Sequence, residues 1–285
     1  MHPGLGIYLD RLTREYGPEY LHTDPIGAVR RFDDADDQEI AGFLAAGLAF
    51  GRVNIILPHL EDLWGRLDQE PARVVHDWTP SDRKRLRGFV HRWVSGSDLA
   101  HVLDALGRVR RRHGSLRSLF LEGYDPAALD LASVLSRFVN ALKHEIPDRA
   151  RTRGVLTFLP DPAQGAACKR LNLYLRWMVR PEDGIDLGLW KPVRPDQLVM
   201  PLDTHVSRLS RYLGLTERRT VNWKMAAEIA ARLRTFDPLD PIRFDFALSR
   251  LGILEACPRR VNPILCRACS LVSVCTLGRE AHVGV

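Results

Sequence analysis

The chain has 285 residues, of which 45% are hydrophobic and 27% are charged. This balance is typical of an ordinary globular protein and excludes an intrinsically disordered chain. No run approaches the roughly eighteen consecutive apolar residues of a membrane span, so we expect no membrane partner. The formal net charge is +6, and residues 201–285 hold thirteen Lys or Arg against eight Asp or Glu, a local excess of +5. A nucleic-acid surface and a solvated basic face both fit this excess.

Apolar residues recur at helical spacing in several segments, and this pattern predicts an all-α fold. Strand-like alternation is scarce, and Pro and Gly fall mainly between the segments. In chain order the predicted helices cover residues 37–48, 55–67, 99–109, 127–142, 166–179, 206–213 and 223–233.

The first two predicted helices form a helical hairpin. An acidic run at residues 33–37 places negative charge at the amino end of the first helix, where the helix dipole favours it. That helix ends near Gly51 and the next begins near Val53, so Phe50, Gly51 and Arg52 lie at the tip. By default, Phe50 is a packing residue and Arg52 a solvated one.

A polar stripe runs along the predicted helix at residues 166–179. Lys169, Asn172, Arg176 and Arg180 follow one another at steps of three, four and four, which places them on one face. This face is either the solvated side of an amphipathic helix or a surface that meets an anion or a sugar-phosphate backbone. Cys168, in an apolar context, is expected to be a small buried side chain.

A carboxylate stands at a predicted helix start in Pro201-Leu202-Asp203-Thr204-His205. Asp203 or Thr204 can cap the helix, and Gly214 can end it. A carboxylate fixed at such a junction is also well placed for catalysis.

Four of the five cysteines lie near the carboxyl end, at Cys257, Cys266, Cys269 and Cys275. The start of the chain lacks the features of a signal peptide, so we expect a reducing compartment in which disulfides are rare. Four thiolates at this spacing can saturate a zinc ion or the corners of an iron-sulfur cluster. The spacing alone leaves these two alternatives open.

Taken together, these residues resemble the helix-hairpin-helix DNA glycosylase superfamily, and in particular endonuclease III and the adenine glycosylases. The resemblance rests on Leu202-Asp203-Thr204-His205-Val206-x-Arg208-Leu209, followed downstream by the four-cysteine loop. The stretch from Asn172 to Arg180, NLYLRWMVR, is similar to a bacterial conserved family of unknown function within this superfamily. The resemblance covers about residues 37–275.

The resemblance implies a DNA repair enzyme that flips a damaged or mispaired base out of double-stranded DNA and excises it. Asp203 would be the catalytic carboxylate, and Lys169 the lysine that adds AP lyase activity. The four cysteines would hold a 4Fe-4S cluster, with zinc as the alternative. Trp177 and Trp190 are weaker candidates for stacking on the base. The expected DNA contacts are Phe50, Arg52, Asn172, Arg176, Arg259, Arg260 and Arg267.

Three departures from the glycosylase pattern are visible. The first cysteine gap is eight residues where endonuclease III has six, and the usual Leu-Pro-Gly-x-Gly hairpin is reduced to LPDPAQGAACK. Alignment on Asn172 makes Lys169 the catalytic lysine, whereas alignment on Gly165 places Ala167 there. Residues 181–201 form an apparent insertion. A non-catalytic DNA or RNA binding protein with the same fold is therefore the alternative function.

The resemblance also implies an architecture. Residues 35–202 would form a barrel-like helical lobe with a divergent helix-hairpin-helix region. Residues 1–34 and 203–285 would form a second helical lobe that ends in the cluster loop at 257–275. We expect a monomer in the cytoplasm, associated with the nucleoid.

Overall fold

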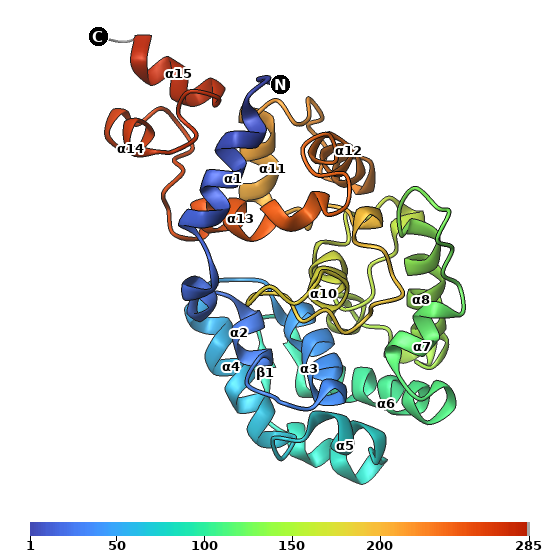
Figure 1. Ribbon diagram of the computed structural model, residues 1–285. Helices are drawn as coiled ribbons and strands as arrows, with labels where there is room; N and C mark the ends of the chain where they lie inside the picture. Colours follow the sequence, from blue (N-terminus) through green and yellow to red (C-terminus); the bar gives the residue numbers. More distant parts are fainter. Residues whose placement is uncertain (284–285) are drawn as a thin grey trace.

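The computed structural model describes residues 1–283, and most of these lie in helices (Figure 1). The α-helices are α1 (Leu5–Glu15), α2 (Pro25–Val29), α3 (Ala35–Leu48), α4 (Val53–Arg66), α5 (Pro71–His76), α6 (Gly96–His113), α7 (Leu116–Leu121), α8 (Ala132–His144), α9 (Arg153–Leu156), α10 (Lys169–Val179), α11 (Thr204–Tyr212), α12 (Trp223–Leu233), α13 (Asp245–Ile253), α14 (Pro263–Ala268) and α15 (Thr276–Val283). Short 3-10 turns η1 to η6 cover Pro18–Thr23, Pro80–Leu86, Asp148–Ala150, Pro162–Gln164, Pro195–Gln197 and Pro241–Phe244.

The predicted all-α character is confirmed, since each helix expected from periodicity has a counterpart in the structure. The predicted start of the first hairpin helix is explained by capping. The Asp34 carboxylate accepts hydrogen bonds from the backbone N–H of Asp36 (2.9 Å) and Asp37 (3.0 Å), which satisfies donors that the first turn leaves free.

Helix α3 lies at the centre of the fold and is buried over most of its length. It packs against α2, α5 and α10. Two glycines allow this close packing. A Cβ atom at Gly47 would lie 2.1 Å from Cδ1 of Phe158, and one at Gly42 would lie 2.7 Å from the Met178 methyl group. The Phe158 ring leaves no room for a Cβ, so α3 requires glycine at position 47, whereas the Met178 methyl group is the flexible end of its side chain.

The two ends of the chain pack together. Helix α1 contacts α13, and α11 also contacts α13, whereas α2 packs against α3 and α4 (Figure 1). The predicted division into lobes at residues 34/35 and 202/203 stays a prediction. None of the helices within residues 1–283 has the length and apolarity needed to cross a bilayer.

One short β-hairpin departs from the all-α prediction. Strands β1 (Val90–His91) and β2 (Val94–Ser95) pair antiparallel, with Val90 opposite Ser95 and His91 opposite Val94. Arg92 and Trp93 form the turn, and Arg92 has a positive φ of 55°. With two residues per strand, the hairpin is too short for the alternation that predicts strands.

Candidate nucleic-acid surface at the hairpin tip

The tip between α3 and α4 is held by a lysine and an arginine from other elements. The Nζ of Lys169, the first residue of α10, donates to the Ala49 carbonyl at 3.2 Å. Gly51 has a φ of +106°, and a Cβ there would lie 3.0 Å from an Nη atom of Arg92. The tip therefore needs a glycine for its turn, and it lies against the β-hairpin. The structure thus brings together Phe50, Lys169 and the β1–β2 turn.

Planar side chains form a column at this tip. Phe50 stacks on Trp93 with 4.6 Å between ring centroids and 25° between planes. The guanidinium of Arg170 lies 5.2 Å from the Phe50 ring, and that of Arg153 lies 4.3 Å from the Trp93 ring. Arg92 adds a further guanidinium at 5.6 Å from Trp93. Cations over aromatic faces are attracted by the ring quadrupole, so each contact is favourable.

A buried histidine supports the column from inside. The Nε2–H of His91 donates to the Phe50 carbonyl at 3.1 Å, because a carbonyl can only accept. The Nδ1 of His91 therefore accepts from the Nδ1–H of His59 at 2.8 Å when both rings are neutral. Burial lowers the pKa of His91, and the neighbouring His59 and Arg92 lower it further against the effect of the Phe50 carbonyl. His91 is thus held as a neutral ring at neutral pH.

The cations of this surface have no carboxylate partner. Arg52, Arg92, Arg153, Lys169 and Arg170 form no ion pair within the part of the chain that the structure describes. Arg170 is half-buried and donates to the Thr157 carbonyl at 2.8 Å and 3.1 Å. Burial lowers its pKa. Without neighbouring carboxylates, this surface keeps its positive charge available to an anion.

Lys169 and Arg170 also sit in the first turn of α10, which contains no acidic residue. The amino end of a helix carries partial positive charge and unsatisfied N–H groups. Two cations at this end are repelled by the partial positive charge of the helix terminus. An anion bound there would offset this repulsion.

Asp203 is the N-cap of α11. Its Oδ1 accepts from the backbone N–H of His205 and Val206, each at 2.8 Å, so the predicted capping role is confirmed. The side chain is half-buried. No hydrogen bond or ion pair joins Asp203 to Lys169 in residues 1–283. Burial raises the pKa of the Asp245 carboxyl to about 6, and the negative charge of Asp203 makes a smaller contribution in the same direction.

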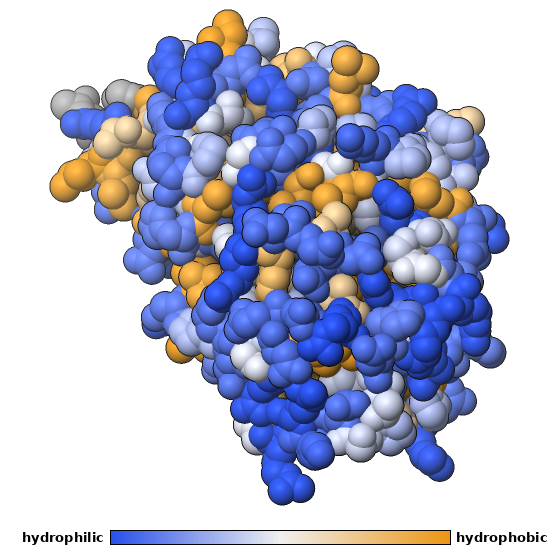
Figure 2. Space-filling model, turned by 60° about the horizontal axis from the view of Figure 1, so that its bottom comes forward, coloured by the Kyte–Doolittle hydropathy of each residue, from blue (hydrophilic) through white to orange (hydrophobic). Residues whose placement is uncertain are grey.

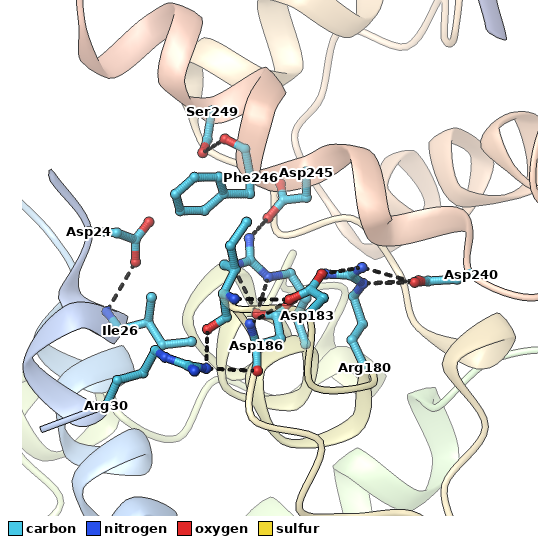
Figure 3. Close-up of polar contacts among 12 residues, drawn as sticks. Asp24, Ile26, Arg30, Arg180, Asp183, Asp186, Asp240, Asp245, Phe246 and Ser249 are labelled. Atoms are coloured by element: carbon cyan, nitrogen blue, oxygen red, sulfur yellow. Dashed lines mark hydrogen bonds and ion pairs between the residues drawn. The ribbon is translucent and has the colours of Figure 1, made fainter. Parts of the chain in front are cut away.

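Arg176 and Asn172 of the predicted polar stripe are buried and bonded within the protein, which corrects their assignment as DNA contacts, whereas Lys169 at the start of α10 is only half-buried. Arg176 is 1% exposed and forms ion pairs with Asp186 (3.0 Å) and Asp245 (2.6 Å). Figure 3 labels both of these carboxylates, together with Arg180. Asn172 is 2% exposed and donates to the Ala167 carbonyl at 3.0 Å. Arg180 pairs with Asp186, Asp183 and Asp240. A buried guanidinium needs such partners because its desolvation is costly.

Trp177 and Trp190 are core residues, which corrects their assignment to a base pocket. Trp177 is fully buried and Trp190 is 1% exposed. The Trp190 Nε1–H donates to the Glu39 carboxylate at 2.9 Å, and its ring packs on Phe120 and Tyr174. Neither indole has a face free for a nucleobase.

The four terminal cysteines line one small cavity. Its lining includes all four, Cys257, Cys266, Cys269 and Cys275. The other residues that line the cavity have apolar side chains or are glycine. Burial raises the pKa of Cys257, Cys269 and Cys275. Among the described residues, no group of three or more candidate ligand side chains is close enough to hold a metal ion. The metal-ligand role of the cysteines stays a prediction. Burial raises the pKa of Cys168 to about 12, as expected for a buried thiol.

The arginines of the cysteine segment are exposed. Arg259, Arg260 and Arg267 all face solvent. The segment is tied to α11 by two hydrogen bonds, from Arg208 to the Cys257 carbonyl and from Tyr212 to the Arg259 carbonyl, both 3.1 Å. The residue that caps α11 and the basic cysteine segment therefore belong to one packed unit.

Five residues of the tip surface were not predicted: His91, Arg92, Trp93, Arg153 and Arg170. The only signal in the sequence is the stretch Phe89-Val90-His91-Arg92-Trp93-Val94, in which an aromatic follows two basic residues. Arg153 lies 60 positions from Trp93 and has no motif of its own, so only the fold brings it to the ring.

The comparisons with known proteins identify a family without assigning an activity. No curated protein matches the chain. No solved structure matches it either. Residues 24–254 match the model of a family described as "Protein of unknown function (DUF2400)". This match spans most of the 285 residues, including the hairpin tip, the β-hairpin, α10 and Asp203, and the chain therefore belongs to this family of unknown function.

Proposed function

We propose that this protein is a DNA glycosylase that engages DNA through the surface around the hairpin tip. The observation that carries the proposal is the cluster of unpaired cations, Arg52, Arg92, Arg153, Lys169 and Arg170, arranged around Phe50 and Trp93. Polynucleotides are bound by cations that contact phosphates and by aromatic rings that contact bases. Phe50, at the tip, is the residue that would enter the gap left by a flipped base.

Asp203 supplies the chemistry in this proposal. Departure of a base leaves positive charge on the sugar, and an ionised carboxylate nearby stabilises that charge. Two backbone N–H groups fix the Asp203 carboxylate in place, so little reorganisation is needed. For AP lyase activity, the neutral amine of Lys169 would add to the C1′ aldehyde of the abasic sugar and expel water to form a Schiff base, after which β-elimination would break the C3′–O bond and release the 3′ phosphate. In this proposal, base excision requires Asp203. Lys169 is required only for the lyase activity.

The terminal cysteines fit a 4Fe-4S cluster by their donor chemistry, because four thiols line one apolar cavity. Such a cluster would fold the basic segment that carries Arg259, Arg260 and Arg267, which would contact phosphates. Iron and acid-labile sulfide in protein purified without oxygen are expected. A stoichiometric zinc content would instead support the zinc alternative.

The test is base release from duplexes that each contain one damaged or mispaired base. Wild type is expected to release one of these bases, and Asp203→Asn to lose release by at least about tenfold, the effect of 1.4 kcal/mol of transition-state stabilisation. Asparagine caps a helix as well as aspartate does, so this variant keeps α11. Asp34→Asn is the matched control, since Asp34 caps α3 in the same way.

Lys169→Ala addresses the lyase step. With wild type, borohydride is expected to trap a covalent adduct on DNA with an abasic site, and the variant is expected to form none. If no lesion is processed, the glycosylase proposal is wrong. The non-catalytic alternative is favoured by one observation: both proposed catalytic residues already have structural contacts, Lys169 with Ala49 and Asp203 with α11. DNA binding without base release would support that alternative.

A further inference from the structure

Trp93 differs from every other tryptophan of the chain in its exposure. It is 38% exposed, whereas the remaining five, Trp64, Trp78, Trp177, Trp190 and Trp223, are 7% exposed or less. An exposed indole next to guanidinium groups is unusual for a residue with only a packing role, because tryptophan is usually highly buried. The face it offers calls for a ligand with an aromatic plane.

The indole of Trp93 is fixed in orientation before any ligand arrives. Its Nε1–H donates to Oγ1 of Thr157 at 2.8 Å, and Thr157 is itself buried. Phe50 stacks on the ring at 4.6 Å. Because these contacts hold the ring, a base that stacks on it would not incur the entropy cost of ordering the side chain.

The group that lies over the indole is the guanidinium of Arg153. Arg153 is exposed, forms no ion pair within the described residues, and places its guanidinium 4.3 Å from the ring centre. A guanidinium is planar and cationic, so it occupies the position that a stacked nucleobase would take. The flexible stem of Arg153 allows its guanidinium to move from the ring to a neighbouring phosphate. Arg92, which precedes Trp93 in the turn, can contact a second phosphate.

We propose that Trp93, with Arg92 and Arg153, forms a binding position for an unpaired base of single-stranded DNA beside the hairpin tip. The proposal rests on the proposed function only in taking DNA as the ligand. A base inside a duplex has both faces covered by its neighbours, whereas an unpaired base offers a free face to the indole. The substrate class that follows is DNA with an unpaired stretch next to the duplex.

The exposure of Trp93 provides a direct readout. The intrinsic fluorescence of the whole protein is titrated with a short single-stranded oligodeoxynucleotide of mixed sequence. Stacking on the only exposed indole is expected to quench the emission. Trp93→Phe keeps an aromatic face, so it should bind with near wild-type affinity but lose the ligand-dependent quenching. Trp93→Ala should lose the quenching and bind about 5- to 140-fold more weakly, which corresponds to about 1–3 kcal/mol of stacking.

Two further measurements sharpen the test. A fully paired duplex of the same sequence should quench less than a duplex with an unpaired stretch. Arg153→Gln should lower the magnitude of the slope of log K against log salt by about 0.7 for single strands, the effect of one lost phosphate contact. Arg219→Gln, which changes another exposed arginine without an ion pair in the described chain, should leave this slope unchanged.

The proposal is overturned if DNA binds wild type without quenching, or if Trp93→Ala binds the single strand as tightly as wild type. The Trp93→Phe result keeps the test decisive even where Trp93→Ala is less stable, because phenylalanine retains the packing on Phe50. These outcomes do not depend on base release. Absence of base release would count against the glycosylase proposal and leave the stacking result standing.

Discussion

At the tip of the α3–α4 hairpin, one histidine connects the interior to the proposed DNA surface. His91 is fully buried and binds the Phe50 carbonyl on one side and His59 on the other. Burial, together with His59 and Arg92, lowers the pKa of His91 and so disfavours the charged ring in the native state. The unfolded chain has no such constraint.

This arrangement predicts a pH dependence of stability. The pKa of His91 is lower in the folded state than in the unfolded chain. Below about pH 6.5, the unfolded state therefore binds a proton at His91 more readily than the native state does. The contribution of His91 to stability is therefore present above this pH and lost as the pH falls through 6.5 toward the folded pKa. Denaturant unfolding of wild type and His91→Gln between pH 7.5 and 5 measures it.

The variant should show a weaker loss of stability on acidification than wild type. His22→Gln serves as the control, because His22 is exposed and should leave the wild-type pH dependence in place. Identical pH dependence in wild type and His91→Gln would contradict the role assigned to His91.

The residues of α10 show what periodicity can and cannot reveal. The periodicity correctly placed Lys169, Asn172 and Arg176 on one helix, whereas Arg180 is the C-cap that follows it, with extended backbone. Whether such a face meets solvent or carboxylates depends on partners elsewhere, and Asp245 lies 69 positions from Arg176. A stripe of basic residues looks the same in both cases, so burial could not be predicted.

Helix α3 depends on close packing at Gly47. Gly47 admits the Phe158 ring, whose Cδ1 and Cε1 atoms would lie 2.1 and 2.2 Å from an added Cβ. Gly47→Ala should therefore lower the free energy of unfolding by about 1–3 kcal/mol, because the ring and helix must move apart. Chemical denaturation measures the change.

Gly65→Ala is the matched control on the neighbouring helix α4. A Cβ at Gly65 meets nothing within 4 Å. Alanine also has the higher helix propensity, so this variant should be as stable as wild type or more stable, by up to about 1 kcal/mol. Equal destabilisation by both substitutions would show that the Phe158 contact is not the cause.

The helices were predictable because their apolar periodicity and their caps, such as Asp34 and Asp203, are local signals. The β1–β2 hairpin was not, because its strands have two residues each. This hairpin carries His91 and Trp93. The element that could not be predicted is therefore the one that completes the candidate surface.

At the scale of the whole molecule, a buried ion network joins segments that are distant in sequence. Asp186 is fully buried and pairs with both Arg176 and Arg180, while Arg176 also reaches Asp245 on α13 (Figure 3). Burial raises the pKa of Asp186, against the effect of the two arginines. The apparent insertion after Arg180 is thereby fixed to α10 as part of the core.

Asp186→Ala should lower the free energy of unfolding by about 3–5 kcal/mol, because it leaves two buried guanidinium groups without a shared carboxylate. Glu182→Ala is the control, since the exposed Glu182 pairs with Arg30 at the surface and should matter little. A small effect of Asp186→Ala in urea unfolding would contradict the proposed importance of the network.

The face shown in Figure 2 is mostly hydrophilic, with hydrophobic residues gathered at its upper left and across its middle. The exposed apolar side chains of the protein include Val261, Ile264 and Leu265 of the cysteine segment. The overall basic charge could be predicted from composition. The unpaired cluster at the tip could not, because it combines cations from the start of α4, the β-hairpin, α9 and α10, outside the segment 201–285 that holds most of the net charge.

The central claim is that DNA binds at the hairpin tip, and its most direct test is the salt dependence of DNA affinity. Replacing Arg92, Lys169 and Arg170 by Gln should weaken duplex binding and reduce the magnitude of the slope of log K against log salt by about 2–3. The control replaces three exposed cations around α12, Arg219, Lys224 and Arg232, by Gln. An unchanged slope in the tip variant, or an equal reduction in both variants, would contradict the account.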